Sequence, residues 1–170
     1  MRAIPFLILC VGVSLLLAGD TTNTEGYDIM KVNHEFLDEK GNTHDRIGNL
    51  VEKARYQKEL EESGRYTGLR FIVHWKAPSS DLRDFTVKVE LRGFDAGMGR
   101  ERLQTLTRDY AEMPGSSGWT NLDLKGNDLK DFGRLMAWKV ALLQNGKPMA
   151  TRKSFTWDDP PPADRKAEGS

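Results

Sequence analysis

Cysteine is nearly absent from this chain. The one cysteine, Cys10, lies inside an apolar run, and it follows Leu9 rather than the small residue that a lipoprotein attachment site requires. Without that run, the chain has no cysteine and therefore no disulfide. A domain of about 150 residues can nevertheless hold its fold by apolar burial alone.

Blocks of like charge are also lacking. The whole chain has 25 basic and 25 acidic side chains. Loss of Arg2 with the first 18 residues would leave one acidic side chain in excess. Because phosphate binding needs a clustered positive surface, this even distribution argues against a nucleic-acid partner and gives no reason to expect anionic lipid.

Motifs for metal binding and catalysis are missing as well. A zinc site needs three or four suitably spaced ligands, whereas His34, His44 and His74 are scattered. The glycine-rich segment 93–99, which we expect to be a loop between strands, lacks the Gly-Lys-Ser or Gly-Lys-Thr ending of a phosphate-binding loop, and no Gly-x-Ser-x-Gly motif occurs. We therefore expect no metal, no cofactor and no enzymatic activity.

The chain does have one long apolar run, at its start. Residues 1–18, MRAIPFLILCVGVSLLLA, place one positive charge before an uncharged stretch that ends in the small residues Ala18 and Gly19. This layout is typical of a secretory signal peptide, cleaved near Ala18 or Gly19. The alternative is an uncleaved membrane anchor, but no basic stop-transfer cluster follows. We expect an exported protein, in the bacterial periplasm or outside the cell.

Short alternating segments dominate the rest of the chain. The clearest is 85–92, where apolar Phe85, Val87, Val89 and Leu91 alternate with polar residues. Such alternation indicates antiparallel strands with one buried face and one solvent-exposed face. Further strands are predicted at 29–37 (an edge strand), 69–76, 101–110 (weaker), 134–144 and 147–157, with Trp119, Leu122 and Leu124 following a loop.

This pattern predicts an all-β protein, an antiparallel β-sandwich of about seven strands over residues 28–157. A flexible lead would precede it at 19–27. The proline-rich tail 158–170 would be disordered or an extended linker. One short N-terminal helix is predicted at 47–62, starting near Asp45 and ending at Ser63-Gly64.

The dipeptide Asn145-Gly146 stands between the last two predicted strands and favours a two-residue hairpin turn. Counting outward places Leu142 opposite Met149 and Ala141 opposite Ala150. The outer face of the hairpin would then carry an unusual strip of apolar residues. We call this the hairpin strip: Leu135, Ala137, Ala141, Leu143, Pro148 and Ala150.

An exposed apolar strip on a sheet invites aggregation, so something should cover the hairpin strip. The predicted helix is the favoured cover, through Leu50, Val51 and Ala54. The alternative cover is another exported protein, which would make the strip a binding surface.

The segment before this hairpin contains Asp131-Phe132-Gly133. This tripeptide holds magnesium in protein kinases, but the chain is too short for a kinase and has no His-Arg-Asp motif. We therefore interpret the tripeptide as a structural feature of the fold. The spacing Leu129-x-Asp131-x-Gly133-x-Leu135-x-Ala137 resembles the corner before the F strand of immunoglobulin-like domains, with Leu135 and Ala137 at the usual Tyr and Cys positions. The resemblance implies an immunoglobulin-like or fibronectin type III-like sandwich.

Two aromatic residues, Tyr110 and Trp119, flank the loop 111–118. Exposed aromatic rings there could stack on a sugar or peptide, although burial in the core is the commoner outcome. Three functions therefore compete: a non-catalytic exported module that binds or positions another macromolecule, a carbohydrate- or small-ligand-binding domain, and, less favoured, a small hydrolase. We favour the first.

Overall fold

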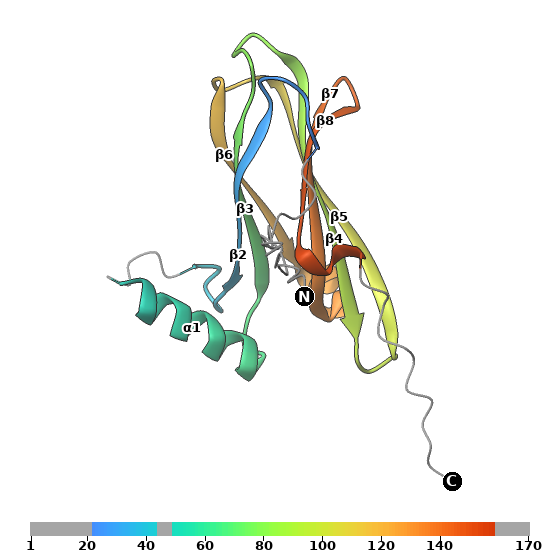
Figure 1. The fold of residues 1–170 in the computed structure, drawn as a ribbon. Coiled ribbons are helices and arrows are strands. Elements are labelled where there is room, and N and C mark those ends of the chain that lie inside the picture. The colour runs from blue at the N-terminus through green and yellow to red at the C-terminus, as the bar shows by residue number, and fades with distance from the viewer. Residues whose placement is uncertain (1–21, 44–48, 159–170) are drawn as a thin grey trace, which may run out of the picture.

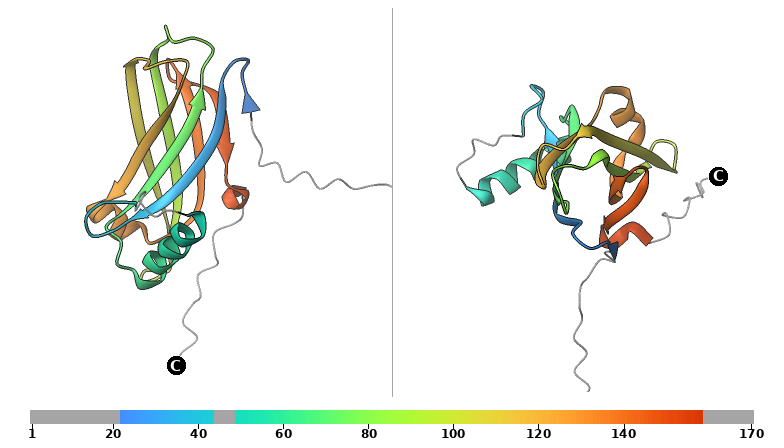
Figure 2. Two further views of the ribbon diagram at one scale, coloured as in Figure 1. Left: turned by 90° about the vertical axis from the view of Figure 1, so that its left-hand side faces the viewer. Right: turned by 90° about the horizontal axis from the view of Figure 1, so that it is seen from above.

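The computed structural model describes residues 22–43 and 49–158. Two antiparallel sheets lie face to face and diverge toward the end of the molecule where helix α1 lies (Figure 1). Figure 2 shows the two layers from the side and from above. The predicted all-β, sandwich-like architecture is thus confirmed. The predicted signal peptide and nearly all of the predicted tail lie outside the described residues.

The larger sheet has five strands in the order β1-β8-β7-β4-β5. Their bounds are β1 Thr22–Asn23, β4 Arg83–Asp95, β5 Arg100–Glu112, β7 Arg134–Gln144 and β8 Lys147–Lys153. The smaller sheet has the order β2-β3-β6, with β2 Asp28–Leu37, β3 Gly68–Lys76 and β6 Ser117–Lys125.

The core lies between the two sheets and is built from the alternation visible in the sequence. Each inward position of β3 and β4 is buried, and Trp75 and Phe85 meet there with ring centroids 5.0 Å apart. The indole Nε1 of Trp75 donates a hydrogen bond of 2.8 Å to Thr120 Oγ1, so this buried ring is also satisfied as a polar group. The largest fully buried side chains are Trp75, Phe71, Phe85, Phe132, Leu37, Leu69, Leu91, Leu124 and Leu142.

Helix α1 spans Leu50–Ser63, close to the predicted range, but it lies in mid-chain between β2 and β3 rather than at an N-terminal position. Asn49 caps its start by accepting a hydrogen bond from the Glu52 amide at 2.8 Å, and the predicted cap, Asp45, lies outside the described residues. Gly64 ends it in the left-handed conformation, with a φ of 64°.

Helix α2, Gly126–Phe132, was not predicted and occupies the corner before β7. Its Phe132 is fully buried and packs against the backbone of Gly93, where a Cβ atom would lie 2.7 Å from the ring. Gly133 has a φ of 75° and lies against the backbone of Phe94, so only glycine fits. Asp131-Phe132-Gly133 is therefore part of the architecture, as the sequence indicated.

The β7–β8 hairpin turns at Asn145-Gly146 as predicted, with φ values of 49° and 75°. A bulge between Leu142 and Leu143 then shifts the register by one residue. Ala150 consequently faces Leu142 in the core instead of lying on the hairpin strip. A second irregularity, beside Gly93 in β4, turns Leu135 toward the core too.

The predicted cover of the hairpin strip is wrong. Leu50 and Val51 of α1 are 86% and 79% exposed, and the helix contacts β2. The chain covers one end of the strip by another element, the 3₁₀ helix η1 at Phe155–Asp158, which contacts β7. Ala137 is accordingly 1% exposed, and Ala141 is also buried. Leu143 is half-buried and Pro148 is exposed.

Three predicted boundaries also need correction. The expected flexible lead includes Thr22 and Asn23, which pair with β8, and Tyr27, which is buried. The segment from Gly93 was expected to be a loop, but β4 continues to Asp95. The last strand ends at Lys153, four residues earlier than expected, because the chain turns into η1.

Candidate functional site

The outer face of the three-stranded sheet carries an exposed aromatic pair. His74 of β3 and Trp119 of β6 are directly opposite in register, and their rings stack with centroids 4.2 Å apart and planes 9° apart. Trp119 is 55% exposed, whereas Trp75, the next residue of β3 on the opposite face, is fully buried. The period of two along β3 thus places one aromatic system in the core and one on the surface.

The same face becomes ionic toward its other end. Arg70 of β3 forms a bidentate pair with Asp123 of β6, at 2.7 and 2.8 Å, and Lys125 adds a contact of 2.7 Å to the same carboxylate. Hydrogen bonds from Arg70, and to a lesser degree from Lys125, hold the pKa of Asp123 below its usual value, although partial burial opposes this. Two cations thus hold one carboxylate on this face of the sheet.

Tyr110, the other sequence-predicted ligand aromatic, does not join Trp119. It lies on β5 opposite Phe85, and its hydroxyl contacts Thr120 Oγ1 at 2.9 Å. Its ring packs near Trp75, with centroids 6.1 Å apart. Tyr110 therefore belongs to the interior between the sheets, and the sequence could not separate the two aromatics because they flank the same loop.

A groove that the sequence did not predict runs along the free edge of β2, beside α1. Gln57 of α1 bridges the two elements, because its side chain accepts a hydrogen bond from the Phe36 amide at 2.5 Å and donates one to the Phe36 carbonyl at 3.1 Å. An ion pair of 2.8 Å between Lys53 and Glu35 lies one turn earlier on the helix. The groove has a volume of about 360 Å³ and is lined by Val32, Asn33, His34, Glu35, Leu50, Lys53, Ala54 and Gln57.

His34 lies at the inner rim of this groove. Its ring is 5.7 Å from that of Phe71, between the sheets. Burial lowers the pKa of His34, and the nearby carboxylates of Glu61 and Glu35 only partly offset that effect. The lowered pKa favours the neutral form of this ring, although His34 as a whole is exposed at the rim of the groove.

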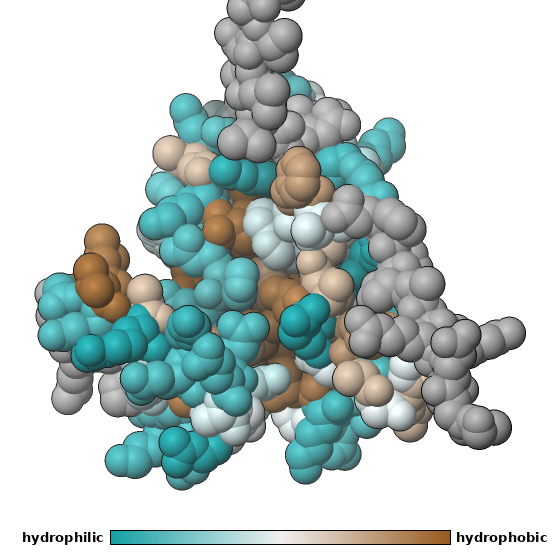
Figure 3. All heavy atoms as spheres, turned by 60° about the horizontal axis from the view of Figure 1, so that its bottom comes forward, coloured by the Kyte–Doolittle hydropathy of each residue, from teal (hydrophilic) through white to brown (hydrophobic). Residues whose placement is uncertain are grey.

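Exposed apolar side chains stand near the groove. Figure 3 shows a hydrophobic cluster projecting from the molecule on the side where Figure 1 places α1, and further apolar surface between the diverging sheets. The first turn of α1 supplies exposed Leu50 and Val51. Phe36, Leu129 and Leu135 line a smaller cavity of about 180 Å³ where the sheets diverge.

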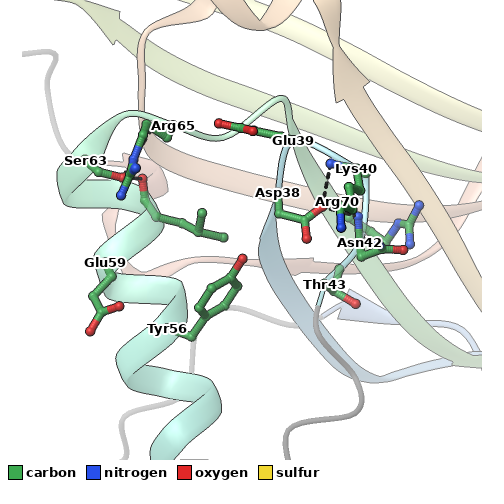
Figure 4. Close-up of a pocket in the computed structure, with 12 residues that line it drawn as sticks. Asp38, Glu39, Lys40, Asn42, Thr43, Tyr56, Glu59, Ser63, Arg65 and Arg70 are labelled. Atoms are coloured by element: carbon green, nitrogen blue, oxygen red, sulfur yellow. Dashed lines mark hydrogen bonds between the residues drawn. The ribbon is translucent and has the colours of Figure 1, made fainter.

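A third cavity, of about 750 Å³, lies between α1 and the turn after β2 (Figure 4). Tyr56 points across it from the helix toward Asp38. The Asp38 carboxylate accepts the backbone amides of Lys40 and Asn42 at 2.8 and 2.9 Å, which fixes the turn. Arg70, which also lines this cavity, is held by Asp123. Asp38 and Arg70 of this cavity thus stabilise the turn and the sheet.

Within residues 22–43 and 49–158, no group of three or more His, Cys, Asp or Glu side chains is arranged to hold a metal ion. In the same ranges, no helix is both long and apolar enough to cross a membrane. No protein-family model, curated protein or solved structure matches this chain. The geometry of the three-stranded sheet is therefore the basis on which function can be argued.

Proposed function

We propose that this protein is an exported, non-catalytic module that binds another protein through its three-stranded sheet. The observation that carries this proposal is the exposed Trp119 ring, held flat against His74 on an open sheet face. A tryptophan already ordered by stacking loses little entropy on binding, and tryptophan is enriched among the residues that dominate binding energy in protein interfaces. Export is supported by the apolar run at residues 1–18.

The sandwich is further proposed to be fibronectin type III-like. The order β2-β3-β6 in one sheet and β8-β7-β4-β5 in the other corresponds to strands A-B-E and G-F-C-C′ of such domains. In this scheme α1 is an insertion between strands A and B, and α2 fills the corner before strand F. Domains of this architecture serve as binding modules in many proteins, which supports the proposal only by analogy.

A carbohydrate-binding domain is the second candidate, because an exposed indole can stack on a sugar ring. Two observations make it the weaker one. Tyr110 faces the interior and cannot form a second wall beside Trp119. Trp119 lies on a strand face rather than among the residues that line the three cavities described above.

Parallel screening distinguishes these candidates. The folded protein is screened against a phage-displayed library of random twelve-residue peptides and against an array of soluble oligosaccharides, together with Trp119→Ala and Phe155→Ala. Phe155 is the matched control, because it is 81% exposed and lies outside the three-stranded sheet. We expect peptides whose affinity falls at least tenfold in Trp119→Ala alone. Oligosaccharides with that response would establish the second candidate, and peptides that bind both variants like the parent would refute the role of Trp119.

Export is tested separately by mass spectrometry of the protein recovered from its natural host. A mature chain that begins near residue 19 is expected, and retention of Met1 would contradict the proposed processing.

A further inference from the structure

We propose that the free edge of β2, from Lys31 to Glu35, takes up an extended segment of a partner protein as an added β-strand. This inference rests on the proposed function and gives it a second contact region, with a defined class of ligand. The ligand is an extended peptide that alternates apolar and polar residues and carries a lysine or arginine near its centre.

The first argument is the orientation of the β2 backbone. In an antiparallel pair, alternate residues direct their N–H and C=O groups away from the partner strand. Gln57 binds both backbone groups of Phe36 from the side opposite β3, so Phe36 is an edge-facing residue. Val32 and His34 share that orientation by the period of two. Among the described residues, their edge-facing backbone groups have no partner.

The second argument is that side chains of the protein itself occupy both ends of this edge, where they bind backbone groups of β2 as an added strand would. Gln57 presents an amide to Phe36, as a backbone peptide group would. At the other end, Arg152 of β8 donates hydrogen bonds of 2.9 Å to the carbonyls of Ile29 and Met30. Between these two contacts, no described residue occupies the edge. A short added strand there would place up to four new backbone hydrogen bonds on Val32 and His34.

The third argument is the chemistry beside the open stretch. The side chain of Glu35 is 12% exposed, and its Oε1 pairs with Lys53. Its Oε2 is shielded from solvent and has no hydrogen-bond partner among the described residues, which is costly for a carboxylate oxygen. A basic side chain on the outer face of an added strand would lie beside this incompletely paired carboxylate and could donate to it once the Glu35 side chain turns toward the ligand.

The fourth argument concerns the inner face of an added strand. Val32 and Phe36 are only partly buried, and they belong to the apolar surface where the sheets diverge. Apolar residues at alternate positions of the ligand would cover them and the neutral His34 ring. The groove between β2 and α1 already provides about 360 Å³ for the incoming chain.

The other edges of the two sheets are less suitable. The long edge strand β5 carries six charged residues, which disfavour pairing with another strand: Arg100, Glu101, Arg102, Arg108, Asp109 and Glu112. The outer edge of β6 lies beside β5, which contacts it across the sandwich. β1 has only two residues. Among the edges formed by residues 22–43 and 49–158, β2 is therefore the one best suited to an added strand.

The experiment uses the peptide with the highest affinity from a phage-displayed library of random nine-residue sequences, made synthetically with and without single backbone N-methyl groups. In strand addition, methylation of alternate residues removes hydrogen bonds to β2 and should weaken binding at least tenfold, whereas methylation of the intervening residues should have little effect. Binding should also protect the Val32 and His34 amides from hydrogen exchange. Equal tolerance of methylation at every position, with unchanged exchange at both amides, would overturn the inference.

Variants of the protein supply independent readouts. His34→Pro removes an edge-facing amide without removing a β2–β3 hydrogen bond, so a folded variant should lose binding. Circular dichroism establishes that it folds, and if it does not, the N-methyl series decides. Glu35→Gln should weaken binding of a peptide with a central lysine about tenfold, whereas Glu101→Gln, which alters the Arg92–Glu101 pair of the other sheet, should not.

These readouts separate this inference from the proposed function. Peptides that respond to Trp119→Ala but not to His34→Pro, Glu35→Gln or N-methylation would preserve the proposed function and refute strand addition. Failure to select any peptide would refute both. Analytical ultracentrifugation tests whether the protein dimerises through β2. A dimer that His34→Pro abolishes, together with no peptide binding, would refute the peptide ligand and show that a second copy of the chain occupies this edge.

Discussion

The outer faces of the two sheets differ in how far the chain itself covers them. On the five-stranded sheet, Lys88 and Lys139 pair with Glu90, and the Trp157 ring of η1 lies 6.0 Å from the guanidinium carbon of Arg92 and 5.9 Å from the Lys139 ammonium nitrogen. That face is covered in part by the chain itself. The three-stranded sheet instead exposes Trp119, and no strand among the described residues pairs with the outer edge of β2. The difference shows that the chain covers more of the outer face of the larger sheet than of the smaller one, which is why the proposed binding surface lies on the smaller sheet.

The largest loss of stability should come from Trp75, and Trp119 on the neighbouring strand of the smaller sheet is the comparison. Trp75→Ala creates a cavity beside Phe85 and removes the hydrogen bond to Thr120, so it should lower the free energy of unfolding by roughly 3–5 kcal/mol. Trp119→Ala should lower it by less than about 1 kcal/mol, because its ring is more than half exposed. Urea denaturation measures both, and similar losses would show that Trp119 is a structural residue.

The covered face of the larger sheet is tested by two glutamates introduced at former members of the hairpin strip. Ala137→Glu buries a charge under η1 and should lower the free energy of unfolding by about 2–4 kcal/mol. Ala141→Glu should cost clearly less, since Lys88 lies opposite residue 141 and can pair with the new carboxylate. Thermal denaturation compares the two variants. Equal stability of Ala137→Glu and the parent would mean that η1 does not cover β7 in solution.

The ionic pairs of the two sheets should differ in strength. Asp123→Asn should cost about 1 kcal/mol near neutral pH, since a bidentate arginine pair exceeds an ordinary surface pair but is still screened by solvent. Glu90→Gln, which involves only lysines, should cost less.

The pKa of folded Asp123 lies below the value of about 3.9 that it has in the unfolded chain. Its contribution is therefore present above that value and disappears as the pH falls through the folded-state pKa. Denaturation curves of parent and Asp123→Asn at several acidic pH values should converge. A difference that persists at the lowest pH would contradict the assigned role of this carboxylate.

The smallest effect should come from His34 at the rim of the groove. Because burial lowers its folded-state pKa, the unfolded chain takes up the proton first, and stability should fall as the pH drops below about 6.5. The carboxylates of Glu61 and Glu35 reduce this effect. His34→Gln should flatten the pH dependence of unfolding between pH 7 and 5, and an unchanged slope would place the titrating group elsewhere.

Prediction from the sequence succeeded where a local pattern and the fold favour the same structure. The alternation in 69–76 and 85–92 placed the core residues of β3 and β4 correctly, because one face of each strand is buried. Asn145-Gly146 gave the position of the hairpin turn. The register beyond the turn was wrong by one residue, because a bulge leaves no clear sequence signal and moves every later side chain of β8 to the opposite face.

The candidate site could be predicted only in part. Tyr110 and Trp119 were found because aromatic residues beside a loop are visible in the sequence, but their separation to the inside and outside depends on which strands pair. The groove beside β2 was missed entirely. Gln57 and Phe36 are 21 residues apart, and a glutamine on a helix gives no local sign that it will bind the backbone of a distant strand.

The sequence by itself determined the secondary structure of most strands, the start and end of α1 to within a few residues, and the turn of the last hairpin, because alternation, capping residues and turn residues act over short distances. Only the tertiary structure decided which faces and edges remained available. The cover of β7 by η1, the position of α1 against β2 and the open stretch of the β2 edge depend on packing between segments that are far apart in the chain, where the balance of burial and hydrogen bonding has no local signature.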